Sequence, residues 1–205
     1  MTVKIKTVKE YHTMNGYTFF FQEFLKHPLQ IGSVVPSSHF LEQRVVETAD
    51  VKSARFVVEL GPGVGGITKA ILKAAGQDFT LLSIDINPNF YGFIKKIKDE
   101  RLIAHLGNAI DLKEIIAGYE LKEPDAVISG IPFSTIGDDC GTKILHSVFD
   151  VLKPGGRFVA YQLSSRVISL CKPVMGEGEV VMELLNIPPM KVCCWRKGNG
   201  NGNRR

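Results

Sequence analysis

The segment VVELGPGVGGIT, residues 57–68, constrains the fold of this chain more than any other. It places four glycines within six residues, between an apolar run and the start of a helical pattern. Glycine tolerates backbone conformations that other residues avoid, and it lets a ligand approach the main chain closely. Gly61, Gly63 and Gly66 also satisfy the G-x-G-x-x-G pattern of dinucleotide sites. The segment therefore predicts a strand, a tight ligand-binding turn and a helix.

The pattern after residue 55 extends this prediction to an α/β fold. Short β-branched runs alternate with helical stretches, which is typical of a parallel sheet with crossover helices. The expected strands are Phe56–Leu60, Thr80–Ile84, Leu102–Leu106, Ala126–Ser129 and Arg157–Gln162. The expected helices are Gly66–Ala75, Pro88–Asp99, Leu112–Gly118 and Asp139–Leu152. Two more strands, Glu179–Leu185 and Met190–Trp195, have no room for a helix between them and predict an antiparallel hairpin at the sheet edge.

The first 50 residues differ in character from the rest. Aromatic and other apolar side chains recur there at helical spacing: Tyr11, Met14, Tyr17, Phe21 and Phe24. Lysines flank this stretch at both ends. A second helix is expected to start at a cap near Ser37 or Ser38. We therefore divide the chain into a helical extension (1–50), an α/β domain (51–197) and a flexible tail (198–205). The extension is expected to act as a lid over the site or as a membrane contact.

Composition sets limits on the class of protein. The chain has 205 residues, of which 44% are hydrophobic and 22% charged, enough for one α/β domain with an extension. Its net charge of +4 permits an anionic partner without requiring one. No uncharged apolar run approaches the roughly 18 residues of a membrane span, and the start lacks a signal-peptide pattern. The four cysteines form no paired C-x-x-C ligands, so we expect neither a zinc site nor a disulfide. Free cysteines are typical of a reducing compartment, which predicts a cytoplasmic location.

Two acidic residues favour one class of ligand over another. Glu59 stands two residues before the first glycine, where a carboxylate is unfavourable for a doubly anionic pyrophosphate. S-adenosylmethionine carries a sulfonium and an ammonium and has no phosphate, so the same carboxylate would help to bind it. Asp85 ends the second strand and is placed for ribose hydroxyls, which either ligand has. The alternatives are a solvated carboxylate for Glu59 and a helix-capping role for Asp85.

The motifs ELGPGVGGIT and SIDINP resemble motifs I and II of class I S-adenosylmethionine-dependent methyltransferases. That family has a Rossmann-like, mostly parallel seven-stranded sheet that ends in a hairpin of the kind expected here. The resemblance implies that the cofactor contacts Glu59, Gly61, Gly63, Gly65, Asp85, Ile86 and Ser129. It also implies adenine contacts from the loop LGNAIDL, through Asn108 and the backbone of Ala109, with loop structuring as the alternative for Asn108 and packing as the alternative for Ala109. The product would be S-adenosylhomocysteine, and no metal is expected.

The segment VISGIPFSTI, residues 127–136, follows the fourth strand, where the methyl acceptor lies in such sheets. Enzymes that methylate amino groups of bases carry a side chain there that accepts from the amino group, but this chain has Gly130. That difference counts against an rRNA adenine dimethylase. The acceptor side is expected to contain Ser129, Gly130, Pro132 and Phe133. A backbone carbonyl near Ser129 or Gly130 would accept from the amine.

Two aromatic residues are further candidates for the catalytic site. The face of Phe133 would stabilise a cationic product, with core packing as the alternative. Tyr17, in the extension, would do the same or assist deprotonation, with a membrane or core contact as the alternative.

A second resemblance concerns the acceptor. HPLQIGSVVPSS together with SGIPF is similar to the bacterial phospholipid N-methyltransferases, over about residues 19–196. It implies methylation of an aminolipid of the phosphatidylethanolamine type by in-line transfer. It also implies a monomer or weak dimer that contacts the inner membrane surface peripherally. The alternative acceptor is a soluble small-molecule amine. The alternative class is a non-catalytic protein that binds a membrane surface or nucleic acid. Nucleic acid is the less expected partner.

Overall fold

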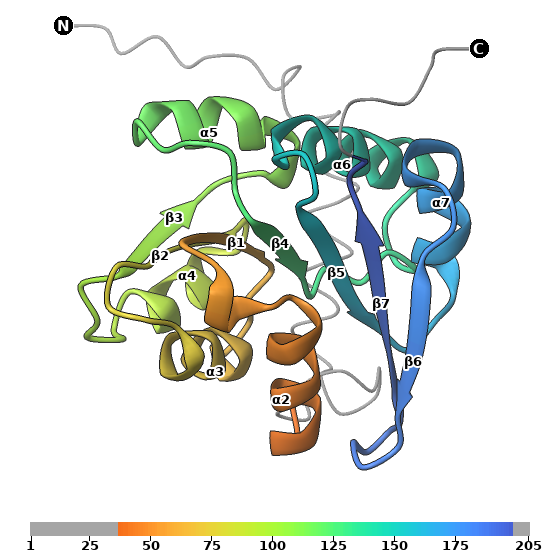
Figure 1. Cartoon of the computed structure of the whole chain (residues 1–205), viewed down its shortest axis with the longest axis horizontal. Coiled ribbons are helices and arrows are strands. Elements are labelled where there is room, and N and C mark those ends of the chain that lie inside the picture. The colour runs from red at the N-terminus through yellow and green to blue at the C-terminus, as the bar shows by residue number, and fades with distance from the viewer. Residues whose placement is uncertain (1–36, 199–205) are drawn as a thin grey trace, which may run out of the picture. The chain divides into compact units, whose positions relative to one another are not determined.

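The computed structural model describes residues 37–198, which belong to one compact unit beginning at Pro36. Its centre is a seven-stranded sheet in the order β3-β2-β1-β4-β5-β7-β6 (Figure 1). The strands are β1 (Phe56–Leu60), β2 (Thr80–Asp85), β3 (Leu102–Leu106), β4 (Ala126–Ser129), β5 (Arg157–Gln162), β6 (Glu179–Glu183) and β7 (Met190–Arg196). Strands β1 to β5 pair in parallel, and β7 runs antiparallel to both of its neighbours.

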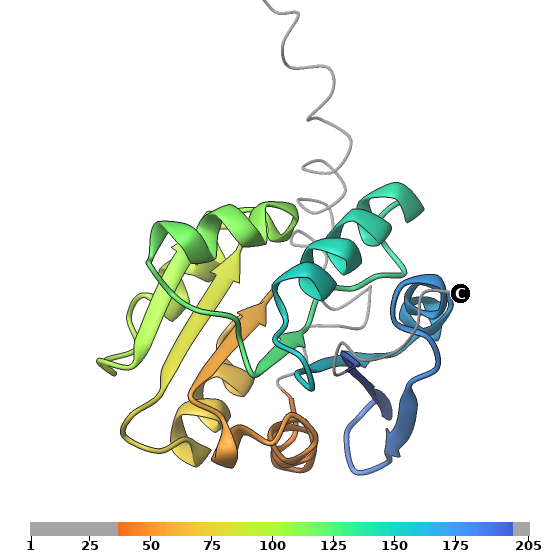
Figure 2. The same cartoon turned by 45° about the horizontal axis from the view of Figure 1, so that its top comes forward.

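Helices cover both faces of this sheet. They are α2 (His39–Thr48), α3 (Gly66–Ala74), α4 (Pro88–Ile94), α5 (Leu112–Gly118), α6 (Asp138–Val151) and α7 (Arg166–Met175), with short 3₁₀ turns η1 (Val51–Ser53) and η2 (Ala109–Asp111). One apolar cluster joins α5, α6 and α7 to the sheet, and a second joins α2 and α3 to the opposite face. Figure 2 shows α5 and α6 above the sheet and α2 and α3 below it. Two buried faces explain why the central strand β1 is buried along its whole length.

The α/β fold predicted from the sequence is confirmed, including the terminal hairpin of β6 and β7. The main differences concern helices. α4 ends at Ile94 instead of Asp99, because the chain turns through short-range bonds from Lys96 N to Phe93 O and from Ile97 N to Ile94 O. α7 is absent from the predicted elements, although its buried residues follow helical spacing: Val167, Leu170 and Cys171.

The predicted helix start at the Pro-Ser-Ser turn is also confirmed. Ser38 is the N-cap of α2, and its hydroxyl accepts from the N–H of Leu41 at 3.2 Å. Leu41 and Val45 are buried against the sheet, so α2 packs on the α/β body although it precedes residue 50. Tyr17 and the rest of the extension up to residue 36 lie outside the described residues. Within residues 37–198, no helix is long and apolar enough to cross a membrane.

Strand directions define the edge at which a site can form. The carboxyl ends of the five parallel strands lie at one edge of the sheet. Lys191 at the start of β7 pairs with Gln162 at the end of β5, and Glu183 at the end of β6 pairs with Met190. The loop between β6 and β7 therefore lies at this same carboxyl edge.

Candidate functional site

The glycine turn after β1 has the backbone geometry that only glycine adopts easily. Gly61, Gly63 and Gly65 have φ angles of +68°, +58° and +86°, all in the left-handed region. Gly65 is the N-cap of α3, and the N–H of Gly61 donates to the carbonyl of Ile84 at 2.9 Å. A Cβ atom on Gly61 would lie 3.3 Å from the side chain of Ile131 in the acceptor loop. The turn thus brings bare main chain close to the end of β4.

Glu59 is fully buried beneath this turn. Its Oε2 accepts from the hydroxyls of Thr68 at 2.7 Å and Ser83 at 2.8 Å, whereas Oε1 has no hydrogen-bond partner among the described residues. Burial raises the pKa of this carboxyl to about 7, although the two hydroxyl donors oppose the shift. The alternative of a solvated carboxylate is excluded. A buried acid with one unpaired oxygen suits a ligand that brings a positive charge.

Asp85 lies at the end of β2 and is 4% exposed. Its carboxylate accepts from the N–H of Asn87 at 2.8 Å, and burial raises its pKa to about 6. The N-cap of α4 is Asn87, so the capping role considered for Asp85 belongs to its neighbour. Ile86, the next residue, is 55% exposed and offers an apolar surface beside the carboxylate.

The loop after β3 places its two candidates differently. The side-chain oxygen of Asn108 accepts from the N–H of Ile110 at 3.1 Å and caps η2, so this side chain structures the loop. Ala109 is buried in the apolar cluster under α5 and α6. An adenine contact by Asn108 or Ala109 therefore stays a prediction. Leu106, which sequence reasoning did not select, is 46% exposed at the end of β3.

The acceptor loop after β4 is held from within. Ser129 is fully buried, and its hydroxyl accepts from the N–H of Ile131 at 3.3 Å. The N–H of Gly130 donates to the carbonyl of Leu60 at 2.8 Å, which ties the loop to β1. Phe133 has no exposed surface and packs in the core cluster. That placement favours the packing alternative for Phe133, since a buried ring has no free face for a cation.

Two residues at the end of β5 belong to this site and were not found from the sequence. Gln162 is buried and bonds twice to the acceptor loop: its Oε1 accepts from the N–H of Phe133 at 3.3 Å, and its Nε2 donates to the carbonyl of Ile131 at 2.8 Å. Tyr161 lies over Gly130. A Cβ atom on Gly130 would collide with the Tyr161 hydroxyl and would lie 2.7 Å from the carbonyl oxygen of Gly61.

The Tyr161 hydroxyl therefore occupies the space that a side chain at position 130 would need. Burial, followed by the nearby carboxylates of Glu59 and Asp85, raises the pKa of Tyr161 well above its usual range. The hydroxyl is consequently a neutral donor and acceptor at physiological pH. The register of β4 and β5 could have indicated that Tyr161 lies beside Gly130. Ser129 pairs with Ala160, so the residues that follow them, Gly130 and Tyr161, are neighbours across the sheet.

These features fit S-adenosylmethionine. The unpaired Glu59 oxygen suits a cation, Asp85 suits ribose hydroxyls, and the exposed Ile86 and Leu106 suit the faces of adenine. The glycine turn allows the cofactor to lie close against the main chain. In the described part of the chain, no cluster of three or more histidine, cysteine or acidic side chains is arranged to hold a metal ion. All four cysteines are free thiols.

Comparison with known protein families gives the same result. The model of the ubiE/COQ5 methyltransferase family matches residues 34–175. The chain belongs to this family. It is an S-adenosylmethionine-dependent methyltransferase, and the class predicted from its glycine and acidic motifs is confirmed.

The matched fraction of the relative's length differs between two curated relatives. This methyltransferase is 30% identical over 147 residues to an ornithine lipid N-methyltransferase of Singulisphaera acidiphila, covering 71% of this chain and 77% of that protein. It is 25% identical over 107 residues to the ribosomal RNA small subunit methyltransferase A of Thermotoga neapolitana, but spans only 38% of it.

Among solved structures, the N-methyltransferase NodS of Bradyrhizobium japonicum in complex with S-adenosylhomocysteine superposes with a TM-score of 0.64. The identity is 12%, and the match covers 87% of this chain and 98% of NodS. At this identity the match supports the fold of the methyltransferase and carries no information on its acceptor.

Proposed function

We propose that this methyltransferase transfers a methyl group to the amino nitrogen of an aminolipid headgroup, of the phosphatidylethanolamine or ornithine-lipid type. The observation that carries the proposal is the geometry at Gly130. A base-methylating site needs a side chain at this position to hold the amino group, and here the Tyr161 hydroxyl and the Gly61 carbonyl fill that space. The similarity to an ornithine lipid N-methyltransferase over 71% of the chain supports the same acceptor class.

The residues beneath the glycine turn would hold the cofactor. When bound, S-adenosylmethionine supplies a methyl group made electrophilic by its sulfonium. Glu59 would interact with the cationic amino acid portion through its unpaired oxygen, and Asp85 would accept hydrogen bonds from the ribose hydroxyls. Gly61 and Gly63 have left-handed backbone angles that would be strained in a residue with a side chain. Because neither carries a side chain, the ligand would lie directly against their main chain.

The end of β4 and β5 would orient the acceptor. A neutral amine has N–H groups to donate and one lone pair to present. The Tyr161 hydroxyl and a backbone carbonyl at Ser129 or Gly130 would accept those N–H groups and direct the lone pair toward the cofactor side. Tyr161 would act as a neutral orienting group, since its raised pKa prevents it from serving as an anionic base. Gln162 would keep the loop that carries these carbonyls in place.

The cellular setting follows from the acceptor. We propose that the protein works in the cytoplasm at the inner membrane surface, as a monomer or weak dimer, with nucleic acid not among its partners. The division into extension (1–50), α/β domain (51–197) and tail (198–205), and the role of the extension as lid or membrane contact, remain part of this proposal. Tyr17 belongs to that segment.

A label-transfer assay tests the acceptor class. Purified protein would be incubated with radiolabelled S-adenosylmethionine and vesicles of phosphatidylethanolamine or extracted ornithine lipid, with a pool of soluble amines in parallel. We expect label in the organic phase, lost in Glu59→Ala and Asp85→Ala and retained in Asp78→Ala, which removes an exposed acid. Label found only in soluble products would replace the lipid with a small-molecule amine.

A further inference from the structure

The loop between β6 and β7 has an inverted pattern of burial. Glu183 and Asn186 are both 5% exposed, whereas Leu184, Leu185 and Ile187 are 69%, 60% and 80% exposed. Single exposed apolar residues are common on protein surfaces. Three within four positions, preceded by the buried Glu183 and interrupted by the buried Asn186, form a cluster that water does not favour. The loop is therefore built to present apolar side chains outward.

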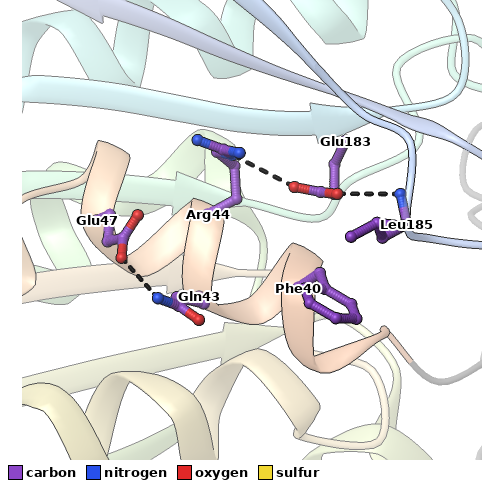
Figure 3. A pocket seen from close by; sticks show the side chains of 6 residues that line it. All are labelled: Phe40, Gln43, Arg44, Glu47, Glu183 and Leu185. Carbon is purple, nitrogen blue, oxygen red and sulfur yellow. Dashed lines mark hydrogen bonds and ion pairs between the residues drawn. The ribbon is translucent and has the colours of Figure 1, made fainter.

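Hydrogen bonds of the buried polar residues fix this shape. The side-chain oxygen of Asn186 accepts from the N–H of Ser38 at 2.9 Å, and its amide nitrogen donates to the carbonyl of Pro188 at 2.7 Å. Glu183 accepts from the N–H of Leu185 at 3.0 Å and pairs with Arg44 at 3.3 Å (Figure 3). The loop conformation thus depends on Glu183 and Asn186, and the leucines are free to contact something else.

The apolar surface continues onto α2. Phe40, in the first turn of that helix, is 50% exposed and lines a shallow hollow with Leu185 (Figure 3). The other side chains of the hollow are Gln43, Arg44, Glu47 and Glu183. We call Phe40, Leu184, Leu185 and Ile187 the apolar tip.

The apolar tip lies at the carboxyl edge of the sheet, the edge of the cofactor and acceptor residues. Glu183 pairs with Met190, and Lys191 pairs with Gln162, which follows Tyr161. At the end of β5, Leu163 is 42% exposed, and the Lys191 ammonium donates to its carbonyl at 3.0 Å. Leu163 thus adds one more exposed apolar side chain at this edge of the sheet.

The charges around the apolar tip suit an anionic surface. Residues 184–191 contain one basic side chain, Lys191, and no acidic one. Two acids line the hollow: Glu183 is paired with Arg44, and Glu47, exposed on α2, accepts from the Nε2 of Gln43 at 2.8 Å. A surface with exposed aliphatic and aromatic side chains and a nearby cation has the chemistry that binds the interface of an anionic bilayer.

We propose that the apolar tip enters the interface of an anionic lipid bilayer and thereby holds the acceptor edge against the membrane. This inference rests on the proposed function, because a membrane contact at this edge is useful when the acceptor is a headgroup in that membrane. It assigns membrane contact chiefly to the loop between β6 and β7, which lies outside the N-terminal extension (1–50) to which only Phe40 of the apolar tip belongs. Insertion of the leucines and Ile187 would supply the apolar contribution, and Lys191 would interact with lipid phosphates.

A tryptophan placed in the apolar tip tests this directly. The chain has a single tryptophan, Trp195, which is 2% exposed and gives a constant background. In Ile187→Trp we expect a blue shift of the added emission with vesicles of phosphatidylethanolamine and phosphatidylglycerol, and quenching by brominated acyl chains. The matched control is Phe93→Trp, since Phe93 is 49% exposed on α4 at the other end of the sheet. Its emission should not respond to the vesicles.

A second pair of variants measures binding. Leu184→Ser with Ile187→Ser should reduce partitioning onto the same vesicles about tenfold, while Phe93→Ser leaves it unchanged. Transfer to aminolipid dispersed in detergent should stay at the parental rate in both. Unchanged vesicle binding of the double variant would overturn the proposal. So would an Ile187→Trp protein whose added emission is already blue-shifted and shielded without vesicles, because another part of the chain or a second copy would then cover the apolar tip.

The two proposals fail separately. Quenching of the introduced tryptophan by lipid without methylation of any lipid would leave the membrane contact standing and remove the aminolipid acceptor. If the protein methylates detergent-dispersed lipid but its apolar tip shows no response to vesicles, the aminolipid acceptor would stand and the membrane contact would be removed.

Discussion

Glu59 links the stability of the fold to the chemistry of the site. Burial raises its pKa from an ordinary value of 4.5 to about 7, so the native state keeps a proton that the unfolded chain has already lost in this range. Its contribution to the free energy of unfolding therefore falls as pH rises through that window. We expect Glu59→Gln to be more stable than the parent at pH 8, by up to about 3 kcal/mol, and to gain little at pH 5. Urea unfolding at both pH values measures this, and an equal gain at both would show that the carboxyl is ionised throughout.

The same substitution should weaken cofactor binding. A neutral amide lacks the charge that attracts the amino acid portion, so we expect the affinity for S-adenosylhomocysteine to fall about tenfold to a hundredfold at pH 8. In the parent, affinity should increase from pH 5 to pH 8 as Glu59 and Asp85 lose their protons. Calorimetric titration across this range measures both effects, with Asp78→Asn as the control for loss of an exposed acid. A Glu59→Gln protein that binds like the parent would remove Glu59 from the binding site.

Tyr161 offers a test of how the amine is oriented. Tyr161→Phe removes only the hydroxyl that lies over Gly130. A lost hydrogen bond to a neutral amine corresponds to about 1 kcal/mol, so we expect kcat/KM for the acceptor to fall roughly fivefold to tenfold. The dissociation constant for S-adenosylhomocysteine should stay within about twofold. Calorimetry and initial rates together separate these outcomes, and weaker cofactor binding with unchanged turnover would assign the hydroxyl to the cofactor instead.

At the scale of elements, the end of β5 supports the loop after β4. Gln162 makes both a donor and an acceptor bond to that loop, and it is buried. Gln162→Leu keeps the volume but leaves the N–H of Phe133 and the carbonyl of Ile131 unpaired. We expect kcat/KM for the acceptor to fall about tenfold or more, with the affinity for S-adenosylhomocysteine unchanged.

Gln162→Glu is the matched control, because it retains an acceptor for the N–H of Phe133 and should lose less activity than the leucine variant. Initial rates and cofactor titrations on both proteins provide the comparison. Equal losses in the two variants, or a loss of cofactor binding, would contradict a role for Gln162 in positioning the acceptor loop.

Much of the sheet could be predicted from the sequence, because local pattern decides where its strands begin and end. β1, β3, β4 and β5 begin and end at the predicted residues, because each is a short apolar run bounded by turn residues. α7 was missed although Val167, Leu170 and Cys171 have helical spacing, since Pro173 in its last turn and the serines before it resemble a loop. Tyr161 and Gln162 were missed for a different reason. Their roles depend on neighbours about 30 residues away across the sheet, which become visible only once strand register is known.

For the whole molecule, one edge of the sheet collects features that weaken the fold in isolation. Two buried acids with raised pKa values and three glycines in the left-handed region lie there, and the apolar tip stands at the same edge. A ligand that neutralises the acids should therefore stabilise the whole unit. Such a ligand at about one hundred times its dissociation constant adds about 2.7 kcal/mol to the free energy of unfolding.

Comparing two ligands tells which group of the cofactor Glu59 recognises. S-adenosylhomocysteine carries an ammonium, whereas methylthioadenosine keeps the adenine and ribose but lacks the amino acid portion. At equal concentration and pH 8, we expect S-adenosylhomocysteine to raise the melting temperature further, because it alone supplies a cation for the unpaired Glu59 oxygen. In Glu59→Gln the difference between the two ligands should shrink while the effect of methylthioadenosine persists. Scanning calorimetry of both proteins measures this, and an undiminished difference in Glu59→Gln would mean that groups other than Glu59 bind the amino acid portion.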